Sequence, residues 1–210
     1  MKQKIIHQVF FKIDKEMSDY PLFIENQNKW IEWCNKNGYE YKFHTETNID
    51  KYLINDELRD FYTSLRNDWL RVDFIRYLII NQEGGIYIDL DIHLNTKGDE
   101  AFSNYLDNRD ILVSLDLKNK FCNCLFGFPK GSIQSLIDFA IKQTKEKSNI
   151  EIYNVWKGRY LLHSTGASMF AKWCRSKKIE KCNILNDYII NGWTGTWVES
   201  LVNKKVSKKK

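Results

Sequence analysis

The spacing of apolar residues near the N-terminus predicts alternating strands and helices. Residues 5–11 (IIHQVFF) form a largely apolar run, which is typical of a buried first strand. Residues 22–37 repeat apolar side chains at helical spacing, and Gly38 follows as a C-terminal cap. Residues 39–44 (YEYKFH) then alternate as a second strand does. This β-α-β order indicates a parallel sheet, so the pattern predicts an α/β fold.

A second helix and strand follow in the middle of the chain. Asn67-Asp68 can cap a helix that runs to about Gln82, and its apolar positions cover most of its surface, which predicts a largely buried helix. Gly84-Gly85 ends this helix. The segment IYIDLDIHL then alternates apolar and polar residues as one continuous strand. The polar side of that predicted strand consists of Tyr87, Asp89, Asp91 and His93.

The remaining pattern completes a single domain. Short helices and loops are predicted for 45–66, strands for 111–116 and 121–128, and an amphipathic helix for 132–147. A tight turn at 164–166 is followed by another helix, and a short strand precedes the Gly- and Trp-rich end. The sequence contains no internal repeat and no linker. We therefore expect one domain over residues 1–203 and a basic, disordered tail over 204–210.

The net charge of +5 comes from the end of the chain. Five lysines and no acidic residue lie in Lys204–Lys210, which leaves 27 basic and 27 acidic residues in the rest. A neutral body does not indicate nucleic acid as a partner. The tail has two interpretations: a solvated end, or a weak contact with an anionic membrane surface.

Cellular location is predicted from absent signals and from the cysteines. No apolar run approaches the roughly 20 residues that span a bilayer, and the first residues do not form a signal peptide. An odd number of cysteines, five, argues for reduced thiols. We expect a cytoplasmic protein, peripheral at a membrane if the tail binds one.

Asp89 and Asp91 are the first candidates for chemistry. The alternation places both carboxylates on one face near the carboxyl end of a strand, where open α/β sheets bind ligands. Two neighbouring carboxylates repel each other unless a cation or hydrogen-bond donors offset their charge. Mg²⁺ or Mn²⁺ suits such oxygen ligands and can bridge to a diphosphate. The alternative is a solvated strand end, because one Asp-x-Asp is expected by chance in a chain of this composition.

Asp73 and Arg76 are the second candidates. They lie three residues apart, on one side of a helix that is otherwise mostly apolar. A charge pair there must be satisfied by a partner or a ligand. Either the two form a simple ion pair, or they reach a sugar or its diphosphate, with Arg76 donating and Asp73 accepting.

The combination of these residues identifies a family. WLRVDFIRYLIINQEGGIYIDLD strongly resembles the Asp-x-Asp region of glycosyltransferase family 32, the sugar-binding region group that contains a DXD motif. Segments elsewhere resemble its opening Ile-His-Gln strand, its Trp and Tyr-x-Tyr segment, its Thr-Gly-Pro turn and its closing Trp-x-Gly-Ser-Trp. The resemblance covers roughly residues 4–197. The matching elements of the central block are Asp73, Arg76-Tyr77, Gly84-Gly85, Tyr87 and Asp89-Leu90-Asp91.

The resemblance implies a GT-A fold, a Rossmann-like, mixed and mostly parallel sheet flanked by helices. It also implies a nucleoside diphosphate sugar as donor, a divalent metal, and retention of anomeric configuration. Asp91 would then be the direct metal ligand, while Asp89 would bind ribose or sugar, or the metal through water. Asp73 and Arg76 would hold the transferred sugar, as their counterparts do in glucosylating bacterial toxins. Asn123 resembles the asparagine near the sugar, although a strand residue satisfied by backbone is the alternative.

The resemblance assigns nucleotide binding to the Gln8 strand and departs from the family in three places. Phe10 replaces a Trp and offers a smaller ring for stacking on a nucleobase. Ala167 replaces the proline of the turn. Where the family has a closing His-His, this chain has Asn191-Gly192, so Asn191 or Thr196 would have to complete the metal site with weaker oxygen ligands.

The residues and the resemblance together predict a metal-dependent hexosyltransferase that acts on an acceptor hydroxyl, with retention as the resemblance implies. The acceptor would be a glycan, a lipid-linked glycan or a protein, and polysaccharide biosynthesis is the expected role. One alternative keeps the fold and hydrolyses the nucleotide sugar. Another is a non-catalytic binder of sugar nucleotides with a degenerate metal site, which the Asn191-Gly192 replacement favours.

Overall fold

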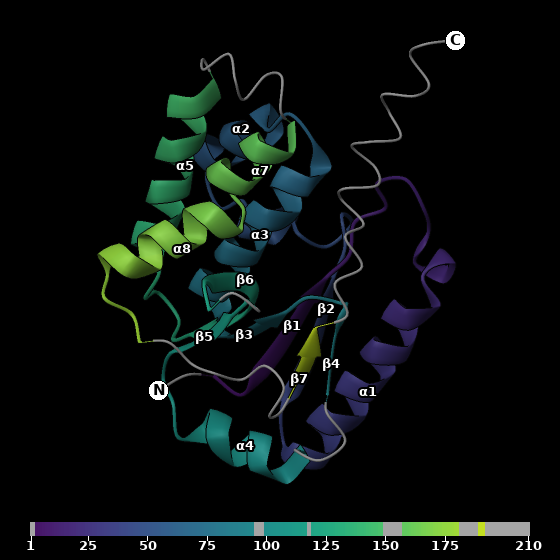
Figure 1. The fold of residues 1–210 in the computed structure, drawn as a ribbon. Coiled ribbons are helices and arrows are strands. Elements are labelled where there is room, and N and C mark those ends of the chain that lie inside the picture. The colour runs from purple at the N-terminus through teal and green to yellow at the C-terminus, as the bar shows by residue number, and fades with distance from the viewer. Residues whose placement is uncertain (1–2, 95–98, 117–118, 149–156, 181–188, 192–210) are drawn as a thin grey trace.

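A five-stranded sheet forms the middle layer of the molecule (Figure 1), in a computed structural model that describes residues 3–94, 99–116, 119–148, 157–180 and 189–191. Its order is β2-β1-β3-β6-β5. The strands are β1 (Ile5–Val9), β2 (Glu40–His44), β3 (Gly85–Ile88), β5 (Leu112–Leu115) and β6 (Phe121–Phe128). β1 is parallel to β2 and β3, whereas β6 is antiparallel to β3 and to β5. Only β6 therefore runs against the others in this sheet, which confirms the predicted mixed and mostly parallel α/β architecture.

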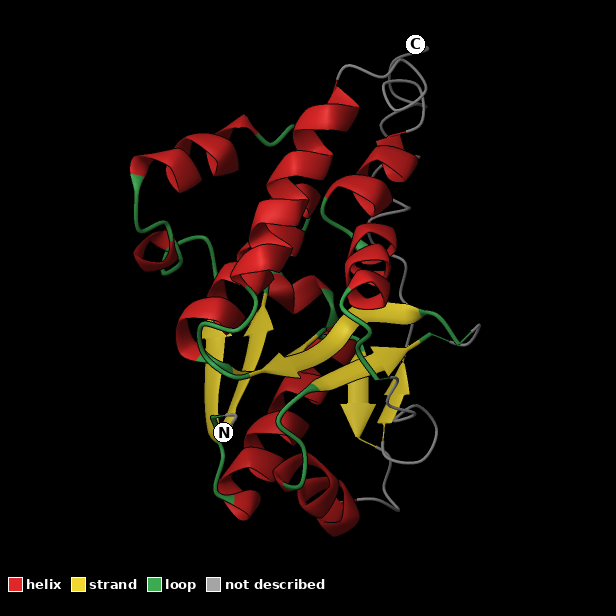
Figure 2. Ribbon diagram, turned by 90° about the vertical axis from the view of Figure 1, so that its left-hand side faces the viewer, coloured by secondary structure: helices red, strands yellow, loops and turns green. Residues whose placement is uncertain are grey.

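Helices cover both faces of the sheet (Figures 1 and 2). On one face lie α2 (Asp56–Ser64), α3 (Asp68–Glu83), α5 (Gln134–Ser148), α7 (Lys157–Ser164) and α8 (Ala167–Ser176). On the other lie α1 (Pro21–Asn37) and α4 (Asp99–Asp107). Two 3-10 turns, η1 (Met17–Asp19) and η2 (Asp50–Tyr52), join the early elements. The predicted β-α-β opening is confirmed as β1-α1-β2.

Side-chain alternation on the strands divides the core into two parts. Ile86 and Ile88 of β3 pack with Trp30 and Trp33 on the α1 side. Tyr87 points to the opposite face and joins the larger cluster beneath α3, α5 and α8. The period of two along β3 thus places a tyrosine on the α3 face of the sheet, where the charged side chains of α3 lie.

The boundaries of α3 follow the sequence signals. The Asn67 side chain accepts a hydrogen bond from the Leu70 amide at 3.0 Å, which is an N-terminal cap. The helix ends at Gly84, as predicted, and Gly85 has φ +91°. A Cβ at Gly85 would lie 2.6 Å from the Ile5 carbonyl oxygen, so only glycine lets β3 begin this close to β1.

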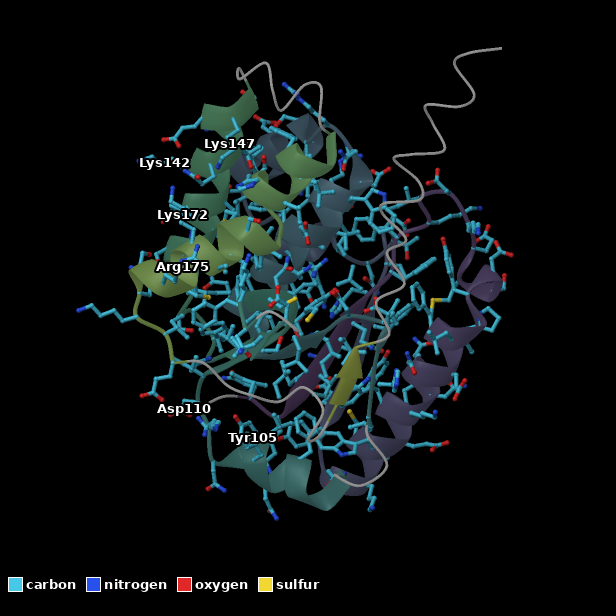
Figure 3. The ribbon with its side chains drawn as sticks, viewed as in Figure 1. Tyr105, Asp110, Lys142, Lys147, Lys172 and Arg175 are labelled. Atoms are coloured by element: carbon cyan, nitrogen blue, oxygen red, sulfur yellow. The ribbon has the colours of Figure 1, made fainter. Side chains whose placement is uncertain are left out.

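The outer helices are amphipathic. Leu136, Ile137 and Ala140 of α5 are buried against the core. Figure 3 shows Lys142, Lys172 and Arg175 on the outer side of α5 and α8, and all three are exposed. This contrast fixes which face of the helices meets the sheet.

The prediction of one continuous strand over IYIDLDIHL is wrong. β3 ends at Ile88, and the amide of Ile92 donates to the carbonyl of Asp89 at 3.1 Å, which closes a turn over residues 89–92. β4 (Ile92–Leu94) then leaves the main sheet and pairs with β7 (Ile189–Asn191) in a second, two-stranded sheet. Asp89 and Asp91 therefore lie on a turn between two sheets and not on one face of a strand.

Several predictions concern residues outside the described part of the chain. These are Thr196, the Gly- and Trp-rich end, and the tail Lys204–Lys210. Within the described ranges, no helix is long and apolar enough to cross a membrane.

Candidate functional site

A buried guanidinium on α3 faces two carboxylates. Nη2 of Arg76 lies 2.9 Å from Oδ1 of Asp73, and Nη1 of Arg76 lies 3.1 Å from Oδ1 of Asp89. Nη1 also donates to the Asn123 carbonyl at 3.0 Å, and Nε donates to the Val72 carbonyl at 3.3 Å. The side chains of Asp73 and Arg76 are both less than one-tenth exposed. Arg76 is therefore both a buried ion-pair partner and the link from α3 to β6 and to the Asp-x-Asp turn.

The two predicted interpretations of Asp73 and Arg76 are thus not exclusive. Asp73 and Arg76 do form an i,i+3 ion pair. Arg76 also bonds Asp89, and sequence alone could not show that Asp89 lies beside Arg76. The three residues lie at the carboxyl end of β3, where an α/β sheet presents its ligands. Four of the site residues expected from the sequence meet here, namely Asp73, Arg76, Asp89 and Asn123.

Asn123 of β6 is bonded through its side chain and not only through its backbone. Its Nδ2 donates to Oδ1 of Asp73 at 3.0 Å and to the hydroxyl of Tyr77 at 3.1 Å. The hydroxyl of Tyr77 in turn donates to the Thr165 carbonyl at 2.7 Å. A chain of hydrogen bonds therefore runs from the Asp73 carboxylate to the turn between α7 and α8.

Tyr87 holds the first aspartate of the Asp-x-Asp turn. Its hydroxyl donates to Oδ1 of Asp89 at 2.5 Å, and the guanidinium carbon of Arg76 lies 4.6 Å from the centre of its ring. Both Arg76 and Tyr87 thus bond the same oxygen of Asp89. From the sequence, Tyr77 is only a match to the family, and Tyr87 is such a match on the polar side of a predicted strand; neither contact could be read from it.

Burial and charge shift the pKa values of the carboxylates in this cluster. Burial raises the pKa of Asp73, and the positive charge of Arg76 opposes that rise. Burial also raises the pKa of Asp89 to about 7; Arg76 opposes this, and the negative charge of Asp91 adds to it. Burial is therefore the main reason why the ionised form of Asp89 is disfavoured, and a bound cation would favour that form.

Buried side chains hold the backbone of the Asp-x-Asp turn from the α1 side. Nδ2 of Asn26 donates to the Leu90 carbonyl at 2.9 Å, and Nε1 of Trp30 donates to the Ile92 carbonyl at 2.8 Å. The Asp89 amide donates to the Cys124 carbonyl at 2.8 Å. Gln8, predicted to bind the nucleotide, approaches the Asp89 carbonyl at 3.5 Å through its Nε2. The turn is thus fixed by α1, β1 and β6 together.

The residues of this turn fit a hard divalent cation. Asp89 and Asp91 supply carboxylate oxygens, and such an ion would offset the repulsion between their negative charges. Among the described residues, no group of three or more His, Cys, Asp and Glu side chains could hold a metal. The two aspartates would therefore need further oxygens, such as those of a diphosphate or water. The backbone of Asn191 pairs with Ile92, the residue after Asp91, whereas Thr196 lies outside the described residues.

Phe10 lies at the end of β1 with further aromatic residues beside it. Its ring is 6.3 Å from that of Tyr20 in an edge-to-face arrangement, and Tyr20 stacks on Phe23 at 4.8 Å. Phe10 is only partly buried. This aromatic group offers flat apolar surface near the turn that Gln8 contacts.

Comparison with known proteins shows what this part of the chain is similar to. The family described as "Glycosyltransferase sugar-binding region containing DXD motif" matches residues 10–107, which include Asp73, Arg76 and the Asp-x-Asp turn. Over these residues the chain is similar to this family, and it is a glycosyltransferase. A search of the curated proteins found no match.

Three solved structures that are similar to this chain are named as glycosyltransferases. "PaToxG Glycosyltransferase" has a TM-score of 0.57 and 13% identity, over 97% of this chain and 75% of that chain. A glycosyltransferase "involved in the glycosylation of the major capsid of PBCV-1" has a TM-score of 0.39 and 14% identity, over 71% and 69%. The UDP-bound glycosyltransferase domain from the YGT toxin has a TM-score of 0.42 and 15% identity, over 80% and 57%. The first of these confirms the GT-A fold.

Proposed function

We propose that this glycosyltransferase moves a hexose from a nucleoside diphosphate sugar to an acceptor hydroxyl, with a divalent metal and with retention of anomeric configuration. The observation that carries the proposal is that the buried side chains of Asp73, Arg76 and Asn123 form one bonded cluster with the partly buried Asp89 of the Asp-x-Asp turn. A surface ion pair needs no such arrangement. A site that binds sugar hydroxyls does, because it must present fixed donors and acceptors.

The transferred sugar would be held by α3 and β6. Asp73 accepts hydrogen bonds from sugar hydroxyls, and Arg76 donates through its planar fork. Asn123 keeps the Asp73 carboxylate oriented toward the sugar. With these groups held in place, retention would follow front-face attack by the acceptor within an ion pair.

The metal would be held by Asp91 directly and by Asp89 directly or through water. Asn191 or Thr196 would add an oxygen ligand from the C-terminal segment, which the β4–β7 pairing supports by bringing Asn191 next to the turn. When bound, Mn²⁺ or Mg²⁺ supplies positive charge that stabilises a diphosphate leaving group. Arg76 would contribute to the same stabilisation from the protein side.

The nucleotide and the acceptor lie on either side of this site in our proposal. Phe10 would stack on the nucleobase, and Gln8 would keep the Asp89 backbone in place beneath it. The acceptor would be a glycan, a lipid-linked glycan or a protein, with polysaccharide biosynthesis as the process. We further propose a cytoplasmic protein whose tail, Lys204–Lys210, contacts an anionic membrane surface weakly.

A donor screen tests the function. A panel of UDP and GDP sugars is incubated with the protein and Mn²⁺, and released nucleoside diphosphate is measured. We expect turnover with one donor, and loss of that turnover in Asp91→Asn with an unchanged circular dichroism spectrum. Asp138→Asn, an exposed aspartate on α5, is the matched control and retains turnover. Full activity of Asp91→Asn would exclude the assignment.

The same assay separates the alternatives. Free sugar without any acceptor product would identify a nucleotide-sugar hydrolase. Tight binding in calorimetry, independent of Mn²⁺ and without turnover, would identify a non-catalytic binder. Deletion of Lys204–Lys210 followed by a liposome sedimentation assay tests the membrane contact.

A further inference from the structure

Tyr77 connects three parts of the fold through one hydroxyl. It lies on α3, one residue after Arg76, and its side chain is buried. Its hydroxyl accepts from Nδ2 of Asn123 on β6 and donates to the carbonyl of Thr165 in the turn between α7 and α8. A hydroxyl in a core position that only filled space would not need both bonds.

The aromatic ring of Tyr77 is fixed by its neighbours. It stacks on Phe170 of α8, with ring centres 5.9 Å apart and planes 3° from parallel, and it contacts Phe126 of β6 at 5.6 Å. Burial raises the pKa of the phenol, so the hydroxyl keeps its proton and remains a donor. The position of the hydroxyl is therefore set by packing and does not depend on a bound ligand.

The turn that Tyr77 holds touches the carboxylate of Asp73. Gly166 follows Thr165, and a Cβ on Gly166 would lie 3.2 Å from Oδ2 of Asp73. The same Cβ would lie 3.0 Å from the Leu161 carbonyl oxygen and from Cα of Leu162. Since φ of Gly166 is −84°, the glycine is required by space and not by conformation. The turn thus packs closely against the second oxygen of Asp73.

We propose that Tyr77 is a positioning residue that orients Asp73 and Asn123 for the donor sugar, by tying Asn123 and the 164–166 turn to α3. This inference rests on the proposed function, in which Asp73 and Asn123 bind the sugar. Without the hydroxyl, the Thr165 carbonyl loses its donor and Asn123 keeps only Asp73 as the partner of its amide. A buried polar group left without its partner is unfavourable, so the turn and Asn123 shift to find other partners.

Tyr77→Phe tests the proposal because it removes one oxygen and keeps the ring. The first readout needs no ligand: hydrogen–deuterium exchange of residues 161–170 is compared with the wild type. We expect faster exchange there in Tyr77→Phe. Unchanged exchange would overturn the proposal, because the hydroxyl would then not hold the turn.

The second readout separates positioning from general stability. Dissociation constants are measured by calorimetry for the nucleotide sugar selected in the donor screen and for its nucleoside diphosphate alone. Tyr77→Phe should raise the dissociation constant of the nucleotide sugar about tenfold, which corresponds to about 1.4 kcal/mol. It should change the dissociation constant of the nucleoside diphosphate less than about twofold. An equal effect on both ligands, or on neither, would overturn the proposal.

Two more variants make the result specific. Tyr39→Phe is the matched control, because it removes another buried hydroxyl, which donates to Asp107 at 2.7 Å on the α1 side of the sheet. It should leave both dissociation constants unchanged. Gly166→Ala should reproduce the selective loss of the sugar, since its added methyl group displaces the Asp73 carboxylate.

Asp73→Asn distinguishes a failure of this inference from a failure of the proposed function. If Asp73→Asn binds the nucleotide sugar with the wild-type dissociation constant, the proposed sugar site at Asp73 is refuted. If Asp73→Asn loses the sugar and Tyr77→Phe does not, only the role of Tyr77 is refuted.

Discussion

At the scale of single residues, Arg76 is the side chain on which the site depends. It is buried, pairs with Asp73 and Asp89, and covers the ring of Tyr87. A lysine could not make the same contacts, because its single ammonium group lacks the planar fork. The sequence identified Arg76 from its spacing to Asp73, whereas its contact with Asp89 required the tertiary structure.

Removing the positive charge of Arg76 should destabilise the protein strongly. In Arg76→Met, the buried Asp73 and the partly buried Asp89 lose their shared cation, so we expect a loss of about 3–5 kcal/mol in the free energy of unfolding. Urea denaturation measures it. Lys29→Met is the control, because Lys29 pairs with Glu25 at the surface of α1 at 2.6 Å.

The control should cost far less, as exposed ion pairs do. Equal costs for the two variants would mean that the buried cluster contributes no more than a surface pair.

At the scale of elements, the turn over residues 89–92 depends on helix α1, although α1 supplies none of the candidate site residues. Asn26 and Trp30 lie four residues apart on α1 and donate to two carbonyls of this turn. The periodicity of the sequence placed both on α1 but could not show what they contact. The same periodicity failed at the turn itself, because strict alternation through Asp91 hides the hydrogen bond between Ile92 and Asp89 that ends the strand.

Asn26→Leu should therefore impair activity from outside the site. It leaves the Leu90 carbonyl without its donor, which costs about 1–3 kcal/mol. Because the turn carries Asp89 and Asp91, we expect kcat/KM to fall about tenfold or more, as small displacements of reacting groups do. Nucleoside diphosphate release measures the effect.

The matched control is Asn37→Leu, which removes an equivalent bond to the Trp33 carbonyl at the far end of α1. It should keep wild-type kcat/KM. The role of α1 would be refuted if both variants were equally active.

At the scale of the whole molecule, a buried polar network outside the site joins α3 to the first two strands. Nδ1 of His7 and Nε2 of His44 are 3.0 Å apart, and Nε2 of His7 donates to the Gly84 carbonyl at 3.0 Å. Tyr52 and Lys42 donate to Glu83 at the other end of this network. These contacts fix where α3 ends, and therefore where β3 and the Asp-x-Asp turn begin.

This network should make the fold sensitive to acid. Burial lowers the pKa of His7 from 6.5 to about 3, and burial also lowers that of His44 to about 4. Burial of Glu83 opposes its ionisation, but hydrogen bonds from Lys42 and Tyr52 outweigh this and lower its pKa to about 2. All three groups bind more protons in the unfolded chain, so their contribution to stability falls as pH decreases, whereas the raised pKa values of Asp73 and Asp89 act in the opposite direction.

This loss of stability should begin near pH 6.5, which is the pKa of histidine in the unfolded chain, and continue toward pH 4 and 3. Glu83 adds to the loss below pH 4.5. Each histidine contributes up to about 1.4 kcal/mol per pH unit. Urea midpoints between pH 8 and 4 measure this loss. His44→Gln should flatten the slope, and an unchanged slope would show that His44 does not titrate as its burial requires.

The sequence by itself determined the order of the elements, the two glycines after α3 and the candidate residues Asp73, Arg76, Asp89 and Asp91. These follow from local rules, because side-chain periodicity and capping depend on neighbours in the chain. Only the tertiary structure decided that Arg76 bonds both Asp73 and Asp89, that the Asp-x-Asp segment is a turn, and that Tyr77 reaches Thr165. The contacts of Arg76 with Asp89 and of Tyr77 with Thr165 join residues 13 and 88 positions apart, and they form only when the fold brings α3, the Asp-x-Asp turn and the α7–α8 turn together.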